Sequence, residues 1–301
     1  MNNRKSSPKI HIILPVHNRI HITRKFIECL TRQTYKNFHL ILVDDGSTDG
    51  TAEYVKKNIG NLTTLYGNGK LWWAGALSKA YNYLSKIDAA SDDLVWINND
   101  DSIFDPDYFE KIINDSCLEP ETLIISPGHS IYTDFIERGF SVDWSLVGFK
   151  KLKEGEPPDA LTTRGLYMLY DTYISLGPMH PMLLPHYLSD LEYTIRAKRR
   201  GFRLVVSRSS HLYVDRSSTG LRKDDSNTTK EFLYNNLISK KTTYNTFYRG
   251  NFVLLAAPLK YKLKSFVTIY IRFLKDRFLP FYKLKSKNFL IKLLKRPDSK
   301  L

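Results

Sequence analysis

The 301-residue sequence contains only two cysteines, Cys29 and Cys117, which lie far apart and form no CxxC motif. A disulfide framework and a cysteine-based zinc site are therefore excluded, and a reducing compartment is expected. The polar N-terminus lacks the apolar core of a signal peptide, and no stretch approaches the roughly 20 apolar residues of a membrane-spanning helix. No GxGxxG sequence follows the first apolar run, which argues against a dinucleotide-binding dehydrogenase.

Apolar residues make up 42% of the chain, enough for one large α/β domain or two small ones. The net charge of +14 is concentrated at one end. Between Ala256 and Leu301 the sequence has 13 Lys and Arg but 2 Asp, so the first 255 residues carry only about +3. The sequence therefore predicts a nearly neutral globular part followed by a basic region.

Short apolar runs alternate with helical patterns through the first half of the chain. Four runs rich in β-branched residues predict strands: Ile10–Leu14, His39–Val43, Thr63–Tyr66 and Leu94–Ile97. Apolar residues with helical spacing follow three of them, at Ile22–Leu30, Ala52–Lys57 and Ala76–Leu84. Later strands are expected at Leu123–Ile125 and Arg203–Val206, a helix at Ser189–Arg200, and helices after about residue 230. This alternation predicts a parallel sheet that is covered on both faces.

Polar residues follow three of the predicted strands directly. In open parallel sheets, ligands bind at the carboxyl ends of the strands. We therefore expect Pro15–Arg19, Asp44–Asp49 and Asn98–Asp101 to meet in space.

The segment Asp44–Gly50 combines carboxylates with residues typical of a tight turn. A carboxylate at this position can accept hydrogen bonds from a base or a ribose hydroxyl. Gly46 permits the turn, and Ser47 or Asp49 can cap the next helix. A plain connection between strand and helix, with an Asp cap, is the alternative.

The segment Asn98–Asp101 offers hard oxygen atoms to a divalent cation. Such a cation would neutralise the charge that develops on a departing diphosphate. Asp100 is the first candidate ligand, supported by Asp101 or Asn98. The alternative is a solvated loop ahead of a helix that begins at Asp105-Pro106.

Three segments occur in order and resemble the N-terminal signatures of the family 2 glycosyltransferases: Ile13–Arg19, Leu42–Thr51 and Trp96–Asp101. The resemblance implies the α/β GT-A fold, which is a Rossmann-like, mostly parallel sheet with flanking helices. It also implies a nucleotide-sugar donor, linked to UDP or dTDP. The donor contacts that it implies are Pro15, Val16, His17, Asn18, Arg19, Asp44, Asp45, Asn98, Asn99 and Asp100.

One position departs from the family pattern, because Asn98 stands where the first acid of the Asp-x-Asp motif is usual. One charged metal ligand is therefore missing. The Asn-Asn-Asp form resembles bacterial rhamnosyltransferase-like members and transferases of O-antigen or capsule polysaccharides. Mg²⁺ or Mn²⁺ is the implied cofactor, with Asp100 and Asp101 as ligands. Some GT-A enzymes add a late histidine, here His211, for which a structural role is the alternative.

The segment Gly67–Ala76 is similar to the family segment that faces the nucleotide-sugar, and it implies donor contacts from Gly67, Lys70, Trp72, Trp73 and Gly75. Glycines allow a close backbone approach, and the start of a helix offers N–H groups. The tryptophans can stack on a base or a sugar, or pack under the sheet.

Two later segments, Gly165–Tyr170 and Pro185–Arg196, resemble the acceptor half of the family. Asp190 matches its catalytic base, while Gly165, Ser189, Glu192 and Arg196 are the implied acceptor-side residues, with Ser189 replacing the usual first acid. A base here would deprotonate the acceptor hydroxyl, and one direct displacement would invert the configuration of the sugar. A cap on a helix at Leu191–Arg200 is the alternative for Asp190. We also expect Arg216–Arg222 to close over the donor.

The basic region has apolar residues at helical spacing between Leu263 and Phe278, and again between Phe289 and Leu294. The pattern favours helices that lie on an anionic membrane surface; packing on the catalytic domain or on a partner is the second alternative, and nucleic acid is the least favoured. We therefore divide the chain into a catalytic domain at 1–230 and a helical, membrane-associating region at 231–301. The catalytic domain has a nucleotide-sugar-binding half at about 1–115 and an acceptor half at about 116–230.

The hypothesis is an inverting glycosyltransferase of surface polysaccharide biosynthesis, cytoplasmic and peripheral at the inner face of the cell membrane. Its acceptor would be a hydroxyl of a saccharide, expected to be lipid-linked. A sugar nucleotidyltransferase is the alternative enzyme. It would need a Gly-rich loop with Arg and Lys to bind a triphosphate, and Pro15–Arg19 is not such a loop. A non-catalytic protein that binds a nucleotide-sugar at the membrane surface remains the other alternative. No oligomeric state is predicted.

Overall fold

The structure is a computed structural model that describes residues 7–145, 148–215, 228–243 and 245–283. Its centre is a seven-stranded sheet in the order β12-β6-β11-β4-β1-β2-β3. The strands are β1 (Ile10–Val16), β2 (Phe38–Asp44), β3 (Leu62–Tyr66), β4 (Leu94–Ile97), β6 (Thr122–Ile125), β11 (Leu166–Leu169) and β12 (Arg203–Val206). The six strands expected from the sequence are all present.

Most neighbouring strands of this sheet run parallel. β1 pairs with β2 and β4, β2 with β3, and β6 with β12, all in parallel register. The exception is β11, which lies antiparallel between β4 and β6. Our expectation of a mostly parallel α/β sheet is confirmed, although we did not predict β11.

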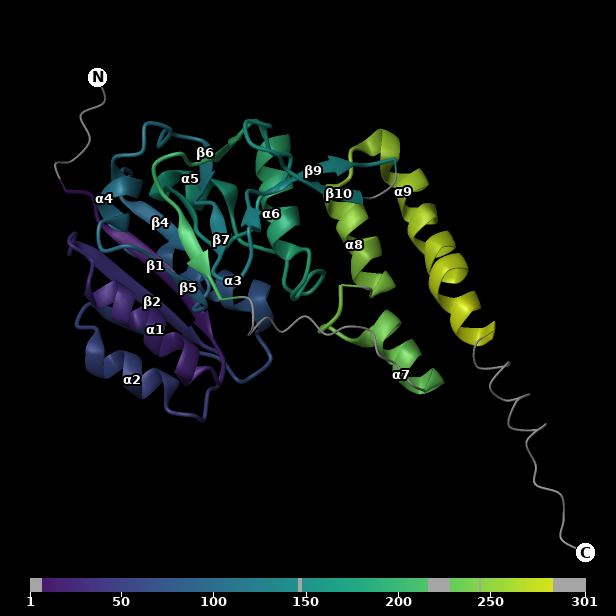
Figure 1. Cartoon of the computed structure of the whole chain (residues 1–301), viewed down its shortest axis with the longest axis horizontal. Helices are drawn as coiled ribbons and strands as arrows, with labels where there is room; N and C mark the ends of the chain where they lie inside the picture. The colour runs from purple at the N-terminus through teal and green to yellow at the C-terminus, as the bar shows by residue number, and fades with distance from the viewer. Residues whose placement is uncertain (1–6, 146–147, 216–227, 244, 284–301) are drawn as a thin grey trace, which may run out of the picture.

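Helices cover both faces of the sheet (Figure 1). They are α1 (Ile20–Thr31), α2 (Thr51–Asn58), α3 (Trp72–Leu84), α4 (Tyr108–Ile113), α5 (Tyr170–Leu176) and α6 (Ser189–Arg199). The alternating side chains of each strand supply two cores. Ile12 of β1 packs in one core with Phe26 of α1, and Ile13 packs in the other with Leu77 of α3. The expected start at Asp105-Pro106 is wrong, because α4 begins at Tyr108 with Asp107 as its N-cap.

Short strands that we did not predict form two further sheets. The first has the order β5-β13-β7-β8, made by β5 (Ser102–Ile103), β13 (Leu212–Val214), β7 (Gly128–Ser130) and β8 (Ile136–Glu137). The second is an antiparallel pair, β9 (Phe140–Asp143) with β10 (Gly148–Lys151). Runs of two to four residues carry too little apolar periodicity to be recognised in a sequence.

The C-terminal part is helical, as expected, and consists of α7 (Thr229–Leu233), the π-helical turn η2 (Tyr234–Ile238), α8 (Thr246–Ala256), α9 (Leu259–Arg272) and the π-helical turn η3 (Phe273–Phe278). A third core joins Leu191 and Ile195 of α6 to Phe252 of α8 and Ile269 of α9. The Arg199 guanidinium of α6 also donates a 2.9 Å hydrogen bond to the carbonyl of Leu255. These helices therefore pack on α6 and extend the molecule to one side (Figure 1).

Among the described residues, no helix combines the length and the apolar composition that are needed to cross a bilayer. The expected loop at Arg216–Arg222 and the apolar pattern after Phe289 lie outside the described residues.

Candidate functional site

The three polar segments expected to meet do meet, at the carboxyl ends of β1, β2 and β4. The Arg19 guanidinium lies 3.3 Å from the Asp100 carboxylate. The His17 Nδ1 atom lies 2.7 Å from the carbonyl of Asp45, and the Asn18 amide donates to the Ser47 hydroxyl at 3.0 Å. The prediction is confirmed, because parallel pairing brings these strand ends to one edge of the sheet.

A cavity of about 450 Å³ lies at this edge. Ten residues of its wall are ones that we predicted: Pro15, Val16, His17, Arg19, Asp45, Trp72, Trp73, Asn99, Asp100 and Asp101. The other six were not among our predicted site residues: Gly69, Ala76, Arg164, His186, Tyr187 and Lys241. The size and the mixed polar and aromatic lining suit a ligand of small-molecule size.

Asp45 fixes the wall of the cavity through backbone hydrogen bonds. Its carboxylate accepts from the amides of Gly69 at 2.8 Å, Leu71 at 2.9 Å and Trp72 at 3.2 Å. Gly67 makes room for this carboxylate, because a Cβ atom on Gly67 would overlap the Asp45 Oδ1 atom. Asp45 therefore holds the start of α3 against the end of β2.

The other carboxylates of the Asp44–Gly50 segment are also engaged within the protein. Asp44 is buried and accepts from the Ser47 amide at 2.8 Å. Asp49 accepts from the amides of Ile20 at 2.9 Å and Thr51 at 3.1 Å, at the first residues of α1 and α2. In the structure these side chains build the turn, which was our alternative interpretation, and their contact with a ligand stays a prediction.

Two arginines balance the charge of the buried acids Asp100 and Asp101. Arg19 lies 3.3 Å from the Asp100 carboxylate, and Arg164 lies 3.2 Å from that of Asp101. Burial raises the pKa of Asp100 to about 6, although the charge of Arg19 and a 2.9 Å hydrogen bond from Thr23 act in the opposite direction. The cost of burial is therefore only partly offset.

One oxygen of this cluster is left for a divalent cation. Both oxygens of Asp100 are engaged, by Arg19 and by Thr23, and the Asn98 Oδ1 atom accepts hydrogen bonds from Asn99 and Ser102. The Asp101 Oδ1 atom is buried and has no hydrogen-bond partner among the residues that the structure describes. A hard, unpartnered carboxylate oxygen beside a second carboxylate fits Mg²⁺ or Mn²⁺. Asp100 as the first ligand stays a prediction, and the unpartnered oxygen makes Asp101 the other candidate.

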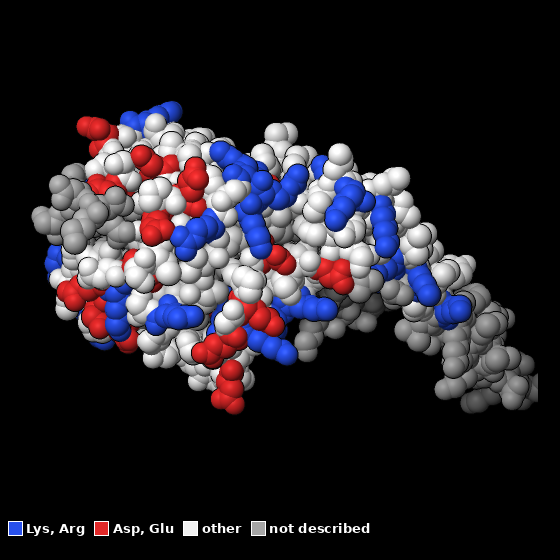
Figure 2. Space-filling view, turned by 90° about the horizontal axis from the view of Figure 1, so that it is seen from above, with Lys and Arg blue, Asp and Glu red and all other residues white. Residues whose placement is uncertain are grey.

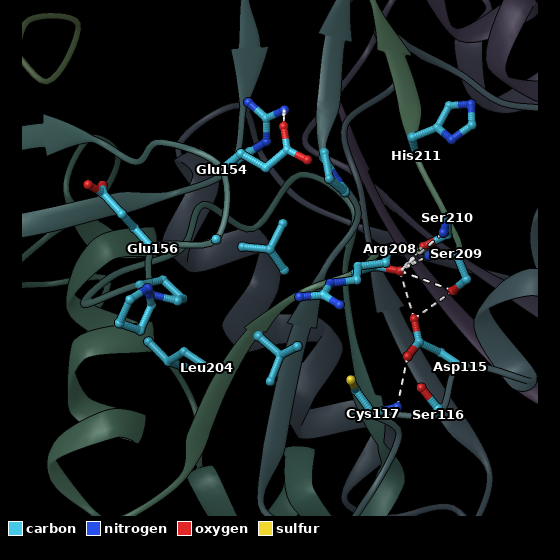
Figure 3. A pocket seen from close by; sticks show the side chains of 18 of the residues that line it. Asp115, Ser116, Cys117, Glu154, Glu156, Leu204, Arg208, Ser209, Ser210 and His211 are labelled. Atoms are coloured by element: carbon cyan, nitrogen blue, oxygen red, sulfur yellow. Dashed lines mark hydrogen bonds and ion pairs between the residues drawn. The ribbon is translucent and has the colours of Figure 1, made fainter.

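His211 lies elsewhere, in a second cavity of about 830 Å³ at the carboxyl ends of β6 and β12 (Figure 3). Its ring contacts His129 and Tyr213, and its Nε2 atom is 3.8 Å from the carboxylate of Asp105. Within the described ranges, no three His, Cys, Asp or Glu residues are grouped as a metal site. The structure therefore does not bring His211 together with Asp100 and Asp101.

The second cavity has its own buried acid, Asp115, which is saturated with hydrogen bonds. Its carboxylate accepts from Tyr167 at 2.7 Å, Ser207 at 2.6 Å and Ser209 at 2.8 Å. Figure 3 shows the bond between Ser209 and Asp115 below His211. The hydrogen bonds of Asp115 join α4 to the loop after β12, so we interpret Asp115 as a structural residue.

Asp190 lies in the first turn of α6, which begins at Ser189. The N-cap is Leu188, in a left-handed conformation with φ of 69°, so our alternative of Asp190 as the cap is wrong. Its carboxylate accepts from the Leu191 amide at 2.9 Å. Burial raises the pKa of Asp190 to about 6, Glu137 raises it further and Arg164 opposes the shift. Asp190 is thus a stronger base than an ordinary aspartate, and it is still mostly ionised at neutral pH.

Arg164 lies at the wall of the cavity, and its charge opposes the rise in the pKa of Asp190 that burial causes. Asp190 does not line the cavity itself, whereas Arg164 does. The guanidinium of Arg164 bridges Asp101 and Glu137, at 3.2 Å from each carboxylate. The two acids that we assigned to the metal and to the base are therefore neighbours of one arginine.

The remaining acceptor-side residues make internal contacts. Ser189 is buried and donates to the carbonyl of His186. Glu192 pairs with Arg196 at 3.0 Å, and Arg196 also donates to the carbonyls of Leu176 and Pro178, each at 2.8 Å. These bonds tie α6 to the end of α5, and contact of these residues with an acceptor stays a prediction.

Glycine is required at position 165 by the backbone and by the lack of space. Gly165 has φ of 72°, and a Cβ atom there would lie 2.5 Å from the side chain of Leu212. Lys70 and Gly75, which we predicted as donor contacts, line a shallower cavity next to the main one. Gly165, Lys70 and Gly75 are therefore outside the wall of the main cavity.

The two tryptophans both line the cavity, but they are held differently. Trp73 donates from Nε1 to the Thr163 hydroxyl at 3.0 Å and packs against a core. Trp72 has φ of 57°, which is rare for a residue other than glycine, and its ring centroid lies 5.6 Å from that of His186. Backbone strain of this kind is concentrated at functional sites.

Comparison with known proteins agrees with the geometry. The model of the family "Glycosyl transferase family 2" matches residues 11–172, which run from β1 into the first turn of α5 and include most of the residues that line the cavity. A Rickettsia typhi protein described as an uncharacterized glycosyltransferase is 32% identical over 114 residues, which are 38% of this chain and 34% of that protein.

An Escherichia coli UDP-Glc:alpha-D-GlcNAc-diphosphoundecaprenol beta-1,3-glucosyltransferase is 34% identical over 96 residues, which are 30% of this chain and 37% of that enzyme. The matches span between 7% and 37% of the length of the curated relatives. Among solved structures, the Pyrobaculum calidifontis mannosyltransferase in complex with GDP-Man and Mn²⁺ aligns with a TM-score of 0.53 at 14% identity, covering 97% of this chain and 82% of that one. That likeness supports the fold alone.

The contact between Gly67 and Asp45 gives a test of how the wall is built. Gly67→Ala should lower the free energy of unfolding by about 1–3 kcal/mol, because the added methyl group would displace the Asp45 carboxylate from the amides that it binds. Urea unfolding measures the change. Gly60→Ala is the control, since nothing lies within 4 Å of a Cβ atom there. Equal stability of Gly67→Ala and wild type would contradict this account.

Proposed function

This chain belongs to glycosyl transferase family 2, and we propose that it is an inverting glycosyltransferase. In this proposal the cavity of about 450 Å³ holds a nucleoside-diphosphate sugar, and Asp190 is the catalytic base. The observation that carries the proposal is the position of Arg164. This arginine contacts Asp101 on the donor side and is a charged neighbour of Asp190 on the acceptor side.

Asp190 would accept the proton of the acceptor hydroxyl as that hydroxyl attacks the anomeric carbon. A base works best when its pKa lies near the working pH, and the pKa of Asp190, raised to about 6, approaches that condition. Attack from the face opposite the diphosphate inverts the configuration at the sugar. Trp72 and Trp73 would cover the sugar and exclude water, which would otherwise hydrolyse the donor.

Asp101 would hold Mg²⁺ or Mn²⁺ through its free oxygen, and the neighbouring Asp100 would add negative charge beside the cation. The bound cation neutralises charge on the diphosphate and makes it a better leaving group. Arg19 and Arg164 lie at the same acids and would add positive charge near the phosphates.

The donor that we propose is linked to UDP or dTDP, and the acceptor is a saccharide carried on a lipid. The Escherichia coli relative, named for UDP-Glc and a diphosphoundecaprenol acceptor, supports this choice. The product would enter a surface polysaccharide, as the Asn98-Asn99-Asp100 sequence also suggests by its resemblance to O-antigen and capsule transferases.

The outer face of α9 would dock the enzyme to the cytoplasmic face of an anionic membrane. Leu259, Leu263, Val267, Ile271 and Leu274 are exposed and share one side of the helix, while Ile269 packs inward. Two exposed lysines, Lys260 and Lys264, border this apolar face. Figure 2 shows Lys and Arg along the end of the molecule that α8 and α9 form, with few acidic side chains among them. An apolar stripe flanked by lysine suits a helix lying in a lipid interface.

Asp190→Asn tests the catalytic base. Transfer should fall by about 100-fold or more, because the amide cannot accept the proton, while the Kd of the donor should stay nearly unchanged. The measurements are donor consumption from a panel of nucleotide-sugars, with membrane extract as acceptor, and donor binding by calorimetry. In the wild type, the rate should rise as the pH increases through about 6, where Asp190 loses its proton.

The control for this variant is Asp171→Asn, which removes an exposed acid from the first turn of α5 and should leave transfer unchanged. Loss of donor binding in Asp190→Asn would count against the assignment of the base. Wild-type protein that binds a donor but never consumes it would instead be a non-catalytic nucleotide-sugar-binding protein.

Asp101→Asn tests the cation site. We expect the Kd for Mn²⁺, measured by titration in the presence of UDP, to rise more than about tenfold, because the amide offers no charged ligand. A chelator should abolish transfer by the wild-type enzyme. His211→Ala is the control and should bind Mn²⁺ as the wild type does, since His211 lies in the other cavity. An equal loss of Mn²⁺ affinity in the two variants would indicate that His211 is a ligand.

Replacing three apolar residues of α9 tests the membrane face. The triple variant Leu263→Ser, Val267→Ser, Ile271→Ser should bind vesicles of phosphatidylglycerol and phosphatidylcholine at least about tenfold more weakly in a sedimentation assay, because it removes buried apolar contact with lipid. Tyr132→Ser, at an exposed aromatic residue outside α9, is the control. Undiminished binding by the triple variant would show that another surface docks.

A further inference from the structure

The segment between η2 and α8 brings two consecutive lysines to Trp72. The Nζ atoms of Lys240 and Lys241 each lie 5.8 Å from the Trp72 ring centroid. The two lysines line different cavities. Lys241 lines the main cavity with Asp100, Asp101 and Trp72, whereas Lys240 lines two neighbouring cavities. The helical region after residue 230 therefore contributes one cation to the wall of the main cavity.

Buried hydrogen bonds fix the position of this segment. The Lys241 amide donates to the hydroxyl of Ser239 at 3.1 Å, and Asn245 donates from Nδ2 to the Ser239 carbonyl at 3.0 Å. Asn245 also caps α8, by accepting from the Tyr248 amide at 3.1 Å. Because α8 packs on α6, the helix that carries Asp190 also determines where Lys241 lies.

Lys241 is the cation of the cavity that no acid balances. Arg19 and Arg164 are paired with Asp100 and Asp101. Across the described ranges, by contrast, no Asp or Glu carboxylate lies within ion-pair distance of the Lys241 ammonium, which has only its contact with the Trp72 ring. The cavity thus has an excess of positive charge on the side that the C-terminal region forms.

His186, which lines the cavity beside Lys241, is neutral. Burial, with a further contribution from the charge of Lys241, lowers the pKa of His186 to about 4, so the imidazole is uncharged at neutral pH. The His186 ring also contacts the ring of Trp72. An anion that enters beside Trp72 would therefore meet Lys241 as the nearest full positive charge on this wall.

Trp72, which lines the same wall of the cavity, has a strained backbone conformation. Its φ of 57° is unfavourable in a residue other than glycine. Asp45 maintains the conformation by accepting the Trp72 amide, together with the amides of Gly69 and Leu71. This backbone conformation places the indole at the wall of the cavity, where His186 and Lys241 contact it.

We propose that Lys241 binds the diphosphate of the donor, so that the C-terminal helical region completes the donor site of the catalytic domain. This inference rests on the proposed function, since it assumes a nucleoside-diphosphate ligand. An ammonium on a flexible stem meets a phosphate as a point charge. It can leave the face of Trp72 for the phosphate without breaking an ion pair, and it would then also face the charge that develops as the diphosphate departs.

Calorimetry with the full chain tests this role, using UDP and uridine as probes, with dTDP and thymidine in their place if the protein prefers them. Lys241→Met should raise the Kd for the diphosphate about fivefold to tenfold, as expected for one charge-assisted contact near solvent, and should leave the Kd for the nucleoside unchanged. Lys241→Arg should bind the diphosphate within about twofold of wild type, because the charge is kept.

Lys240→Met is the matched control, since Lys240 lies at the same distance from Trp72 but outside the main cavity. It should bind UDP as the wild type does. The proposal would be overturned if Lys241→Met bound UDP with wild-type affinity. It would also be overturned if Lys240→Met lost as much affinity for UDP as Lys241→Met. An equal loss for uridine would also overturn it, by showing that Lys241 acts only through the packing of Trp72. If the wild-type protein binds no nucleoside diphosphate at all, the proposed function itself fails.

Discussion

The structure of the site depends on the pairing of two buried aspartates with two arginines. Asp100 and Asp101 are each 3% exposed at the side chain, and burying two carboxylates side by side is costly unless cations accompany them. Arg19 comes from the loop after β1, and Arg164 from the residues before β11. The acids at the end of β4 are therefore held by segments about 80 and 60 residues away in the sequence.

This pairing also changes how the acidic motif works. Because Arg19 and Thr23 contact both oxygens of Asp100, we propose Asp101 as the metal ligand, one residue beyond the family's usual motif. The loss of an acid at Asn98 fits the same arrangement, since its side-chain oxygen serves the turn by accepting from Asn99 and Ser102. In the proposed site, two arginine side chains and one cation would together balance the charge of the donor.

The C-terminal helices have two surfaces, one that faces the catalytic domain and one that faces solvent. Their inner residues pack on α6 and place Lys241 at the cavity. Their outer residues form the exposed apolar face of α9 that we propose for membrane docking. A single rigid connection through α8 would then hold the catalytic cavity at a fixed distance from a lipid surface, which suits an acceptor carried on a lipid.

The sequence by itself determined the α/β sheet, the meeting of Pro15–Arg19, Asp44–Asp49 and Asn98–Asp101, and the family, because strand periodicity and short motifs are local properties. It did not reveal β11 or the short strands of the second sheet, whose pairing is non-local. Only the tertiary structure decided that Asp101 has the free oxygen, that His211 lies in another cavity, and that Arg164 and Lys241 line the site. Those facts depend on which distant side chains neutralise a buried charge, and spacing along a chain does not encode that.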